Sequence, residues 1–166
     1  SGTMVREKTK MEKMLISGVA ADKNVAKIRV AGLGNDPEST FRLLNLLDRN
    51  NLNIDVMIQS LGKDGTKSVS FTVAKPDMLR TIDVLNDNKD SLGIKKLDYD
   101  ENVAKISVIG AGVRSHSGVA AKMFGALANA GINTEMITTS EIRITALIDE
   151  AYADQAMRAI HETFLE

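Results

Sequence analysis

Two short segments end in Gly-x-Gly and are followed by small polar residues, a combination that can bind a charged ligand. One segment covers residues 24–34 and the other residues 102–112. Glycines at a strand end let another group approach the backbone closely, and the N-terminus of a following helix offers free N–H groups and partial positive charge. Such a pocket suits the carboxylate of a free amino acid. The alternative is an ordinary strand-to-helix turn, which composition alone favours because Gly, Asn, Asp and Ser are common in turns.

Neither segment carries a complete dinucleotide-binding fingerprint. That motif requires a third glycine, and Pro37 and Ser115 stand at the required positions. The sequence also contains no GxxxxGK[ST] phosphate loop. We therefore expect no nucleotide site in this chain.

The two histidines do not form a recognisable catalytic or metal-binding set. His116 lies between two serines, and adjacent residues cannot supply the geometry of a Ser–His pair. His161 is 45 positions away, and the chain has no cysteine. This spacing makes a poor metal site, so we predict neither a catalytic residue nor a metal ligand.

The two glycine-containing segments begin two copies of one structural unit. Eight of the eleven residues in 24–34 are identical to those 78 positions later in 102–112. The match slips by two residues in the next loop and resumes between 52–60 and 132–140. The candidate binding residues of both copies therefore depend on the same framework of elements.

The apolar pattern of the first copy predicts the order strand, helix, strand, strand, helix, strand. Period-2 alternation indicates the strands, and apolar residues at helical spacing indicate the helices. We expect strands at 25–30, 54–60, 69–73 and 94–99, and helices at 38–51 and 76–88. The apolar face of the first helix comprises Phe41, Leu43, Leu44, Leu46 and Leu47. The charged run at 86–96 reads as a solvated loop.

The second copy repeats this order but has no fourth strand of its own. Its expected strands lie at 103–112, 134–140 and 141–149, and its helices at 117–131 and 152–164. Ile142 is expected to alternate with the buried residues of the third strand, and Tyr152 to align with Ala156 and Ile160. An unassigned apolar stretch lies at 14–20. We predict that this stretch pairs into the sheet of the second copy, because its backbone groups need partners; the rival possibility is pairing with another chain.

The composition is that of a globular protein without a charged macromolecular partner. The chain has 166 residues, a net charge of −1 and 43% hydrophobic residues. This balance argues against nucleic acid and anionic membranes as main partners, and no apolar run approaches the length of a membrane span. The absence of cysteine excludes disulfides. We expect a cytoplasmic location.

The repeated sequence resembles a known family. The stretches "VAKIRVAGLGNDPESTFRLLNLLDRNNLNIDVMIQS" and "AKISVIGAGVRSHSGVAAKMFGALANAGINTEMITTSEIRITALID" are similar to the tandem ACT domains at the C-terminal end of aspartate kinase. The resemblance implies an α+β fold of two ferredoxin-like βαββαβ units, with antiparallel sheets and helices on one face. It places a connector from an absent kinase domain at 1–13, one ACT domain at 24–100, and a second at 101–166 that is completed by the strand at 14–20.

The resemblance also implies a regulatory function. Aspartate kinase uses ATP to phosphorylate the side-chain carboxylate of aspartate, and its ACT domains bind the end products lysine or threonine and inhibit the kinase. The expected partners are a second copy of the chain, a kinase catalytic domain or alpha subunit, and the free amino acid. ATP and Mg would belong to the absent kinase domain, so no cofactor is expected here. The alternatives are an ACT module that mediates assembly without a ligand, and an independent small enzyme.

The family pattern assigns effector-binding positions in both units. In the first unit they are Asn35, Asp36, Pro37, Glu38, Ser39, Thr40, Asn53, Ile54, Asp55 and Gln59. In the second unit they are Ser117, Gly118, Val119, Ala120, Ile132, Asn133, Thr134, Ser140 and Glu141. Three features depart from the family pattern. Glu38 stands in place of Gly, the acid of that loop is displaced by one residue to Asp36, and Ser117 stands in place of Pro.

We expect a bound amino acid to bridge two ACT units. Its carboxylate would meet backbone N–H groups near 38–40 or 118–120, and its ammonium would meet carbonyls around 53–55 or Asn133. Gln59 would contact its polar atoms. The acidic residues of the first unit that could receive a lysine side chain are Asp36, Glu38 and Asp55.

Overall fold

The computed structural model describes residues 16–112 and 117–165, which divide into two compact units. The first unit comprises residues 24–101. The second comprises residues 16–23 together with 102–165. The repeat in the sequence thus corresponds to two structural units, and each is described by itself below.

Some predicted features lie outside the described residues. They include the connector at 1–13, the first two residues of the stretch at 14–20, Ser115 and His116.

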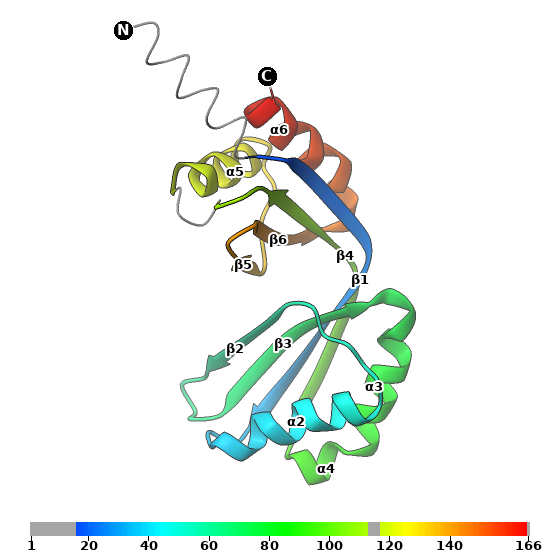
Figure 1. Ribbon diagram of the computed structural model, residues 1–166. Coiled ribbons are helices and arrows are strands. Elements are labelled where there is room, and N and C mark those ends of the chain that lie inside the picture. The colour runs from blue at the N-terminus through cyan, green and yellow to red at the C-terminus, as the bar shows by residue number, and fades with distance from the viewer. Residues whose placement is uncertain (1–15, 113–116, 166) are drawn as a thin grey trace, which may run out of the picture. The chain divides into compact units, whose positions relative to one another are not determined.

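The first unit is an antiparallel sheet with helices on one face (Figure 1). Its elements are the C-terminal part of β1 (Gly18–Leu33), α2 (Pro37–Arg49), β2 (Met57–Leu61), β3 (Lys67–Ala74), the 3₁₀ turn η1 (Lys75–Asp77), α3 (Met78–Asp87), α4 (Lys89–Leu92) and the N-terminal part of β4 (Lys96–Ile109). Their strand order is β2-β3-β1-β4. Ala26, Ile28 and Val30 are fully buried, as their alternation predicts, and pack with Phe71 and Leu43 in one apolar core.

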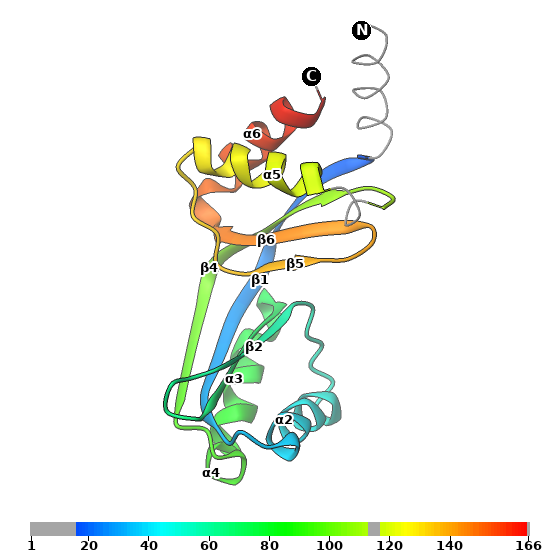
Figure 2. The same cartoon turned by 90° about the vertical axis from the view of Figure 1, so that its left-hand side faces the viewer.

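The second unit has the same arrangement, with strand order β1-β4-β6-β5. Its further elements are α5 (Ser117–Asn129), β5 (Ile137–Thr139), β6 (Arg143–Asp149), the 3₁₀ turn η3 (Glu150–Tyr152) and α6 (Ala153–Leu165). Figure 2 shows α5 and α6 on the same face of β4 and β6. The backbone N–H of Ser17 donates to the carbonyl of Ile109 at 2.7 Å, and Ile16 lies in the core of this unit.

Both units end their first helix with a left-handed residue, as the sequence predicts. Asn51 has φ 56° after α2, and Gly131 has φ 73° after α5. Asparagine and glycine tolerate this conformation, which lets the chain turn from the helix into the next segment.

Two pairs of predicted strands are single long strands in the structure. β1 runs through the predicted break between 20 and 24, and β4 runs through the break between 99 and 103. Neither break contains Gly or Pro, so nothing in the local sequence stops an extended backbone. The charged run at 86–96 is also more ordered than predicted, since it contains α4 and the first residue of β4.

Three apolar residues predicted for buried faces are exposed. Phe41 is 65% exposed because it lies about 200° around α2 from the buried Leu43. Ile142 is 58% exposed and precedes the first residue of β6, and Tyr152 is 46% exposed in the turn before α6. Each lies outside the apolar face that its element turns to the core.

Candidate functional site

The loop between β1 and α2 in the first unit is organised by Asp36. This residue caps α2 with extended backbone, and its Oδ1 accepts from the Ser39 backbone N–H at 2.9 Å. Its Oδ2 accepts from the Ser39 hydroxyl at 2.8 Å. A Cβ on Gly34 would lie 2.5 Å from that same Oδ2, so the approach of the carboxylate to the chain depends on glycine. Pro37 follows at the first helical position, where its missing N–H costs no hydrogen bond.

The Asp36 carboxylate is stabilised in its charged form. The Ser39 hydroxyl and the Ser39 backbone N–H lower the pKa of the Asp36 carboxyl most, and the Glu38 backbone N–H and the Lys67 ammonium add to this lowering. The carboxylate therefore already holds the Ser39 backbone N–H. The sequence had assigned this same amide to the carboxylate of an effector.

Sequence reasoning did not identify Lys67 as part of this site. Lys67 is only 8% exposed, and its Nζ donates to the Asp36 carbonyl oxygen at 2.8 Å and to Thr40 Oγ1 at 3.0 Å. The Thr40 hydroxyl in turn donates to Gln59 Oε1 at 2.7 Å. The structure thus brings Asp36, Ser39, Thr40 and Gln59 together around one buried ammonium group.

A signal for the burial of Lys67 was present in the sequence. Lys67 lies two residues before Val69 and shares its strand face with Val69, Phe71 and Val73, all of which are buried. A lysine in register with a core face must find oxygen partners, because an unpaired buried charge is very unfavourable. The partners come from Asp36, which caps α2, and from Thr40 in the first turn of α2.

The remaining residues predicted at this loop face solvent. Asn35, Pro37 and Glu38 are exposed. The Glu38 carboxylate is 78% exposed and lies 3.3 Å from the Arg42 guanidinium, one helical turn along α2. Glu38 therefore points along the helix surface toward Arg42.

The structure places Asn53, Ile54 and Asp55 away from that loop. The Asp55 backbone N–H donates to the Thr72 carbonyl at 3.1 Å, whereas Gln59 pairs with Val69. Lys67 and Thr72 are five residues apart on β3, which corresponds to roughly 17 Å. The predicted first-unit residues thus fall into two groups, one connected to Lys67 through Thr40 and one beside Thr72.

The second-unit residues at the start of α5 are only partly accessible. Ser117 and Gly118 are exposed, but Val119 is 3% exposed and belongs to the core. Ala120 is half-buried. Ligand contacts at Val119 would therefore have to use its backbone.

Ser140 and Glu141 form a turn at the end of β5. The Ser140 backbone N–H donates to the Arg143 carbonyl at 2.8 Å, and the Ser140 hydroxyl lies 3.4 Å from the same oxygen. The neighbouring Ile142 carbonyl accepts from the Gly110 N–H at 2.8 Å, which fixes the turn beside the end of β4. Both residues are exposed.

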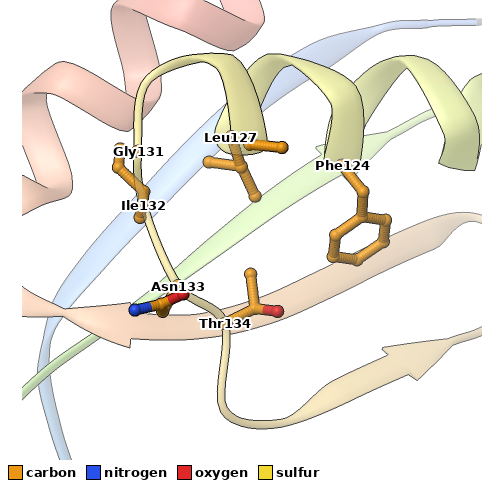
Figure 3. Close-up of a pocket in the computed structure, with 7 residues that line it drawn as sticks. Phe124, Leu127, Gly131, Ile132, Asn133 and Thr134 are labelled. Atoms are coloured by element: carbon orange, nitrogen blue, oxygen red, sulfur yellow. The ribbon is translucent and has the colours of Figure 1, made fainter.

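A pocket lies at the other end of α5. It has a volume of about 440 Å³ and is lined by Phe124, Leu127, Ala128, Gly131, Ile132, Asn133 and Thr134. Figure 3 shows Phe124 and Leu127 on α5 facing the loop that carries Asn133 and Thr134. Three predicted residues therefore line one cavity, with apolar walls and one amide side chain.

The length of α5 separates this pocket from the other second-unit candidates. Ser117 and Asn129 bound a helix of 13 residues, so their Cα atoms are about 18 Å apart. The residues at 117–120 cannot meet the residues at 132–134 within one unit. The residues at 117–120 and those at 132–134 thus form two separate groups, and Ser140 and Glu141 lie in a further turn after β5.

Two other kinds of site are missing from the part of the chain that the structure describes. At 16–112 and 117–165, no group of three or more His, Cys, Asp or Glu residues is placed to hold a metal ion. Over the same ranges, none of the helices combines the length and apolar character that crossing a membrane requires.

Comparison with known proteins identifies the family. A family model described as "ACT domain" matches residues 106–164. A solved structure of aspartokinase alpha and beta subunits is 42% identical, with a TM-score of 0.84 over 91% of this chain and 99% of the matched chain. The chain belongs to the aspartokinase family. The predicted resemblance and the predicted fold of tandem ferredoxin-like ACT units are therefore confirmed.

Further relatives show which part of an aspartokinase is matched. The ligand-free regulatory subunit of aspartate kinase from Thermus thermophilus is 33% identical, with a TM-score of 0.85 over 90% of this chain and 99% of that chain. The aspartokinase of Pseudomonas aeruginosa is 37% identical over 166 residues, which are 98% of this chain and 40% of that protein. The chain is thus the regulatory ACT region, and it spans about 40% of the length of the curated aspartokinases it matches.

Proposed function

We propose that this chain senses a free amino acid, lysine or threonine or both, and transmits its binding to an aspartokinase catalytic domain or subunit. The observation that carries the proposal is the match to the regulatory subunit of aspartate kinase from Thermus thermophilus over 99% of that chain. The catalytic partner would phosphorylate the side-chain carboxylate of aspartate with ATP. Binding at the ACT units would provide feedback inhibition.

The chemistry of the candidate positions supports an amino-acid ligand. The pocket at Asn133 offers an amide side chain next to the apolar walls of Phe124 and Leu127, which suits the polar and aliphatic parts of a small amino acid. The other expected contacts are backbone N–H groups at a helix start, which suit a carboxylate. Within one unit these groups lie too far apart for one ligand, which favours a site that two ACT units complete together, in a homodimer.

Regulation requires that the ligand bind one arrangement of the chain better than another. A ligand shifts an equilibrium only by its differential affinity for the two states, and couplings of about 1–3 kcal/mol are typical. Such a coupling changes the affinity or activity at the partner site by roughly 5- to 150-fold.

Calorimetric titration with lysine and with threonine, separately, tests the proposal. We expect saturable heat with at least one of them, and a loss of that binding in Asn133→Ala, because this change removes the amide from the pocket. Asn129→Ala is a matched control, since Asn129 is an amide residue on α5 that does not line the pocket. No heat with either amino acid would instead support an ACT module that mediates assembly alone.

A further inference from the structure

The two charged groups at the start of α2 each have hydrogen-bond partners within the chain. The Asp36 carboxylate accepts from both the backbone and the hydroxyl of Ser39, and the Lys67 ammonium donates to the Asp36 carbonyl and to Thr40. The Thr40 hydroxyl donates to Gln59 Oε1. Among the described residues, no buried side-chain nitrogen or oxygen lacks a hydrogen-bond partner. The Lys67 ammonium thus has oxygen partners from the chain itself.

Asp36 and Lys67 use polar groups that a free amino acid bound at the start of α2 would need. A ligand carboxylate would need helix-start amides, and the Ser39 backbone N–H already donates to the Asp36 carboxylate. A ligand ammonium would need carbonyl and hydroxyl oxygens, and Lys67 occupies those of Asp36 and Thr40. One carboxylate and one ammonium of the chain itself therefore reproduce the charge pattern of the ligand.

We propose that Asp36 and Lys67 act as a tethered substitute for the effector, so that Lys67 keeps this end of the first unit closed to a free amino acid. The inference rests on the proposed function. It assigns effector binding to the candidate residues of the second unit. Lys67 is then a residue that determines which unit responds.

The second unit has different residues at the positions that correspond to Thr40, Gln59 and Lys67. Gln59 pairs with Val69, and Thr139 pairs with Ile144, so these two pairs correspond in the two units. Lys67 precedes Val69 by two residues. It therefore corresponds to Ile142, the exposed residue two positions before Ile144.

The three replacements in the second unit cannot form the same network. Thr40 corresponds to Ala120, Gln59 to Thr139 and Lys67 to Ile142, because both helices and both sheet registers align. Ala120 and Ile142 have no side-chain hydrogen-bonding groups. The ammonium of Lys67 is thus a feature of the first unit alone, although the two units share one fold.

The size of the expected effect follows from the occupancy of the tethered ammonium. When a ligand binds only a minor state of a protein, its apparent affinity equals its intrinsic affinity multiplied by the fraction of molecules in that state. If Lys67 is in place in nine-tenths of molecules or more, its removal should increase the affinity of the first-unit site by about tenfold or more. Lys67→Met removes the ammonium and keeps a linear apolar stem within the buried register.

The experiment compares wild-type chain, Lys67→Met and Lys63→Met by calorimetry with lysine and with threonine. Lys63 is an exposed lysine in the same β2–β3 connection and is the matched control. We expect Lys67→Met to gain about tenfold in affinity, or an additional binding equivalent per chain, while Lys63→Met behaves as wild type. Adding Gln59→Ala to Lys67→Met should abolish the gain and leave the wild-type binding in place. Lys67→Gln replaces Lys67→Met if circular dichroism shows that the latter does not fold.

The outcomes separate this inference from the proposed function. Wild-type binding with no gain, or a loss, in Lys67→Met would overturn the role of Lys67 and leave amino-acid sensing intact. Binding by Lys67→Met alone would support the role of Lys67 and refute sensing by the natural chain. Silence of both proteins with both amino acids would refute both proposals.

Discussion

Replacing Ile16 by alanine should destabilise the second unit selectively. Ile16 is 4% exposed and packs in the core formed by β4, α5, β6 and α6. The other buried residues of this core begin only at Ala104, far away in the sequence. The next residue, Ser17, donates its backbone N–H to Ile109 at 2.7 Å. The side chain of Ile16 therefore connects the start of the described chain to a core built from its last third.

The magnitude follows from the burial of Ile16. Truncation of a buried isoleucine to alanine costs about 2–5 kcal/mol, since the lost burial and the cavity add. A loss of about 3 kcal/mol lowers the folding equilibrium constant of the affected unit by roughly 100-fold. The first unit shares no side chain with this core and should keep its stability.

Hydrogen exchange measured by mass spectrometry can resolve the two units. In Ile16→Ala, exchange should accelerate by up to roughly 100-fold in α5, β6 and α6 and stay unchanged in α2, β3 and α3. Ile94→Ala is the matched control, because Ile94 is 5% exposed in the core of the first unit. It should give the opposite pattern. Equal acceleration in both units, or none in the second, would refute the reasoning.

Three further predictions concern local hydrogen bonds. Between pH 5 and pH 3, wild type should lose more stability, measured by urea unfolding, than Asp36→Asn. The lowered pKa of Asp36 stabilises the folded protein above the ordinary pKa of about 3.9. This stability is lost as the pH falls through the pKa of Asp36 in the folded protein. Gly34→Ala should lower the melting temperature by several degrees because its Cβ meets Asp36 Oδ2, whereas Gly118→Ala, which has no atom within 4 Å of its Cβ, should not. Thr145→Val should lower the free energy of unfolding by about 1–2 kcal/mol, because the buried hydroxyl of Ser107 loses its partner at 2.8 Å. Adding Ser107→Ala should recover part of that loss. An unchanged denaturant midpoint in Thr145→Val would contradict this.

Periodicity predicted the core well because burial on a sheet face follows from the two-residue repeat of a strand. Ala26, Ile28 and Val30 are fully buried as that repeat requires. The same repeat failed at Ile142, which stands one residue outside β6. Patterns thus predict the middle of an element better than its ends, where tertiary contacts decide which residue is the last to be covered.

The grouping of the candidate site could not be predicted from the order of residues. Asn53 and Gln59 are close in sequence, yet Asn53 precedes β2, whereas Gln59 lies in the middle of β2 and bonds to Thr40. Lys67 lay outside every recognised motif, and its role depends on three oxygen atoms contributed by a loop about thirty residues earlier and by β2. Sequence patterns reveal which residues are buried, but the choice of hydrogen-bond partners requires the structure.

The position of residues 16–23 within the second unit has a consequence for synthesis of the chain. The first unit, at 24–101, lies wholly between the two segments that make up the second. During synthesis, all of the inner unit, residues 24–101, would leave the ribosome before the strands that cover Ile16 have been made. The hydrogen bond from Ser17 to Ile109 joins residues that are 92 positions apart. Because domains fold as they emerge, the inner unit would complete first and shorten the distance that the waiting N-terminal segment has to bridge.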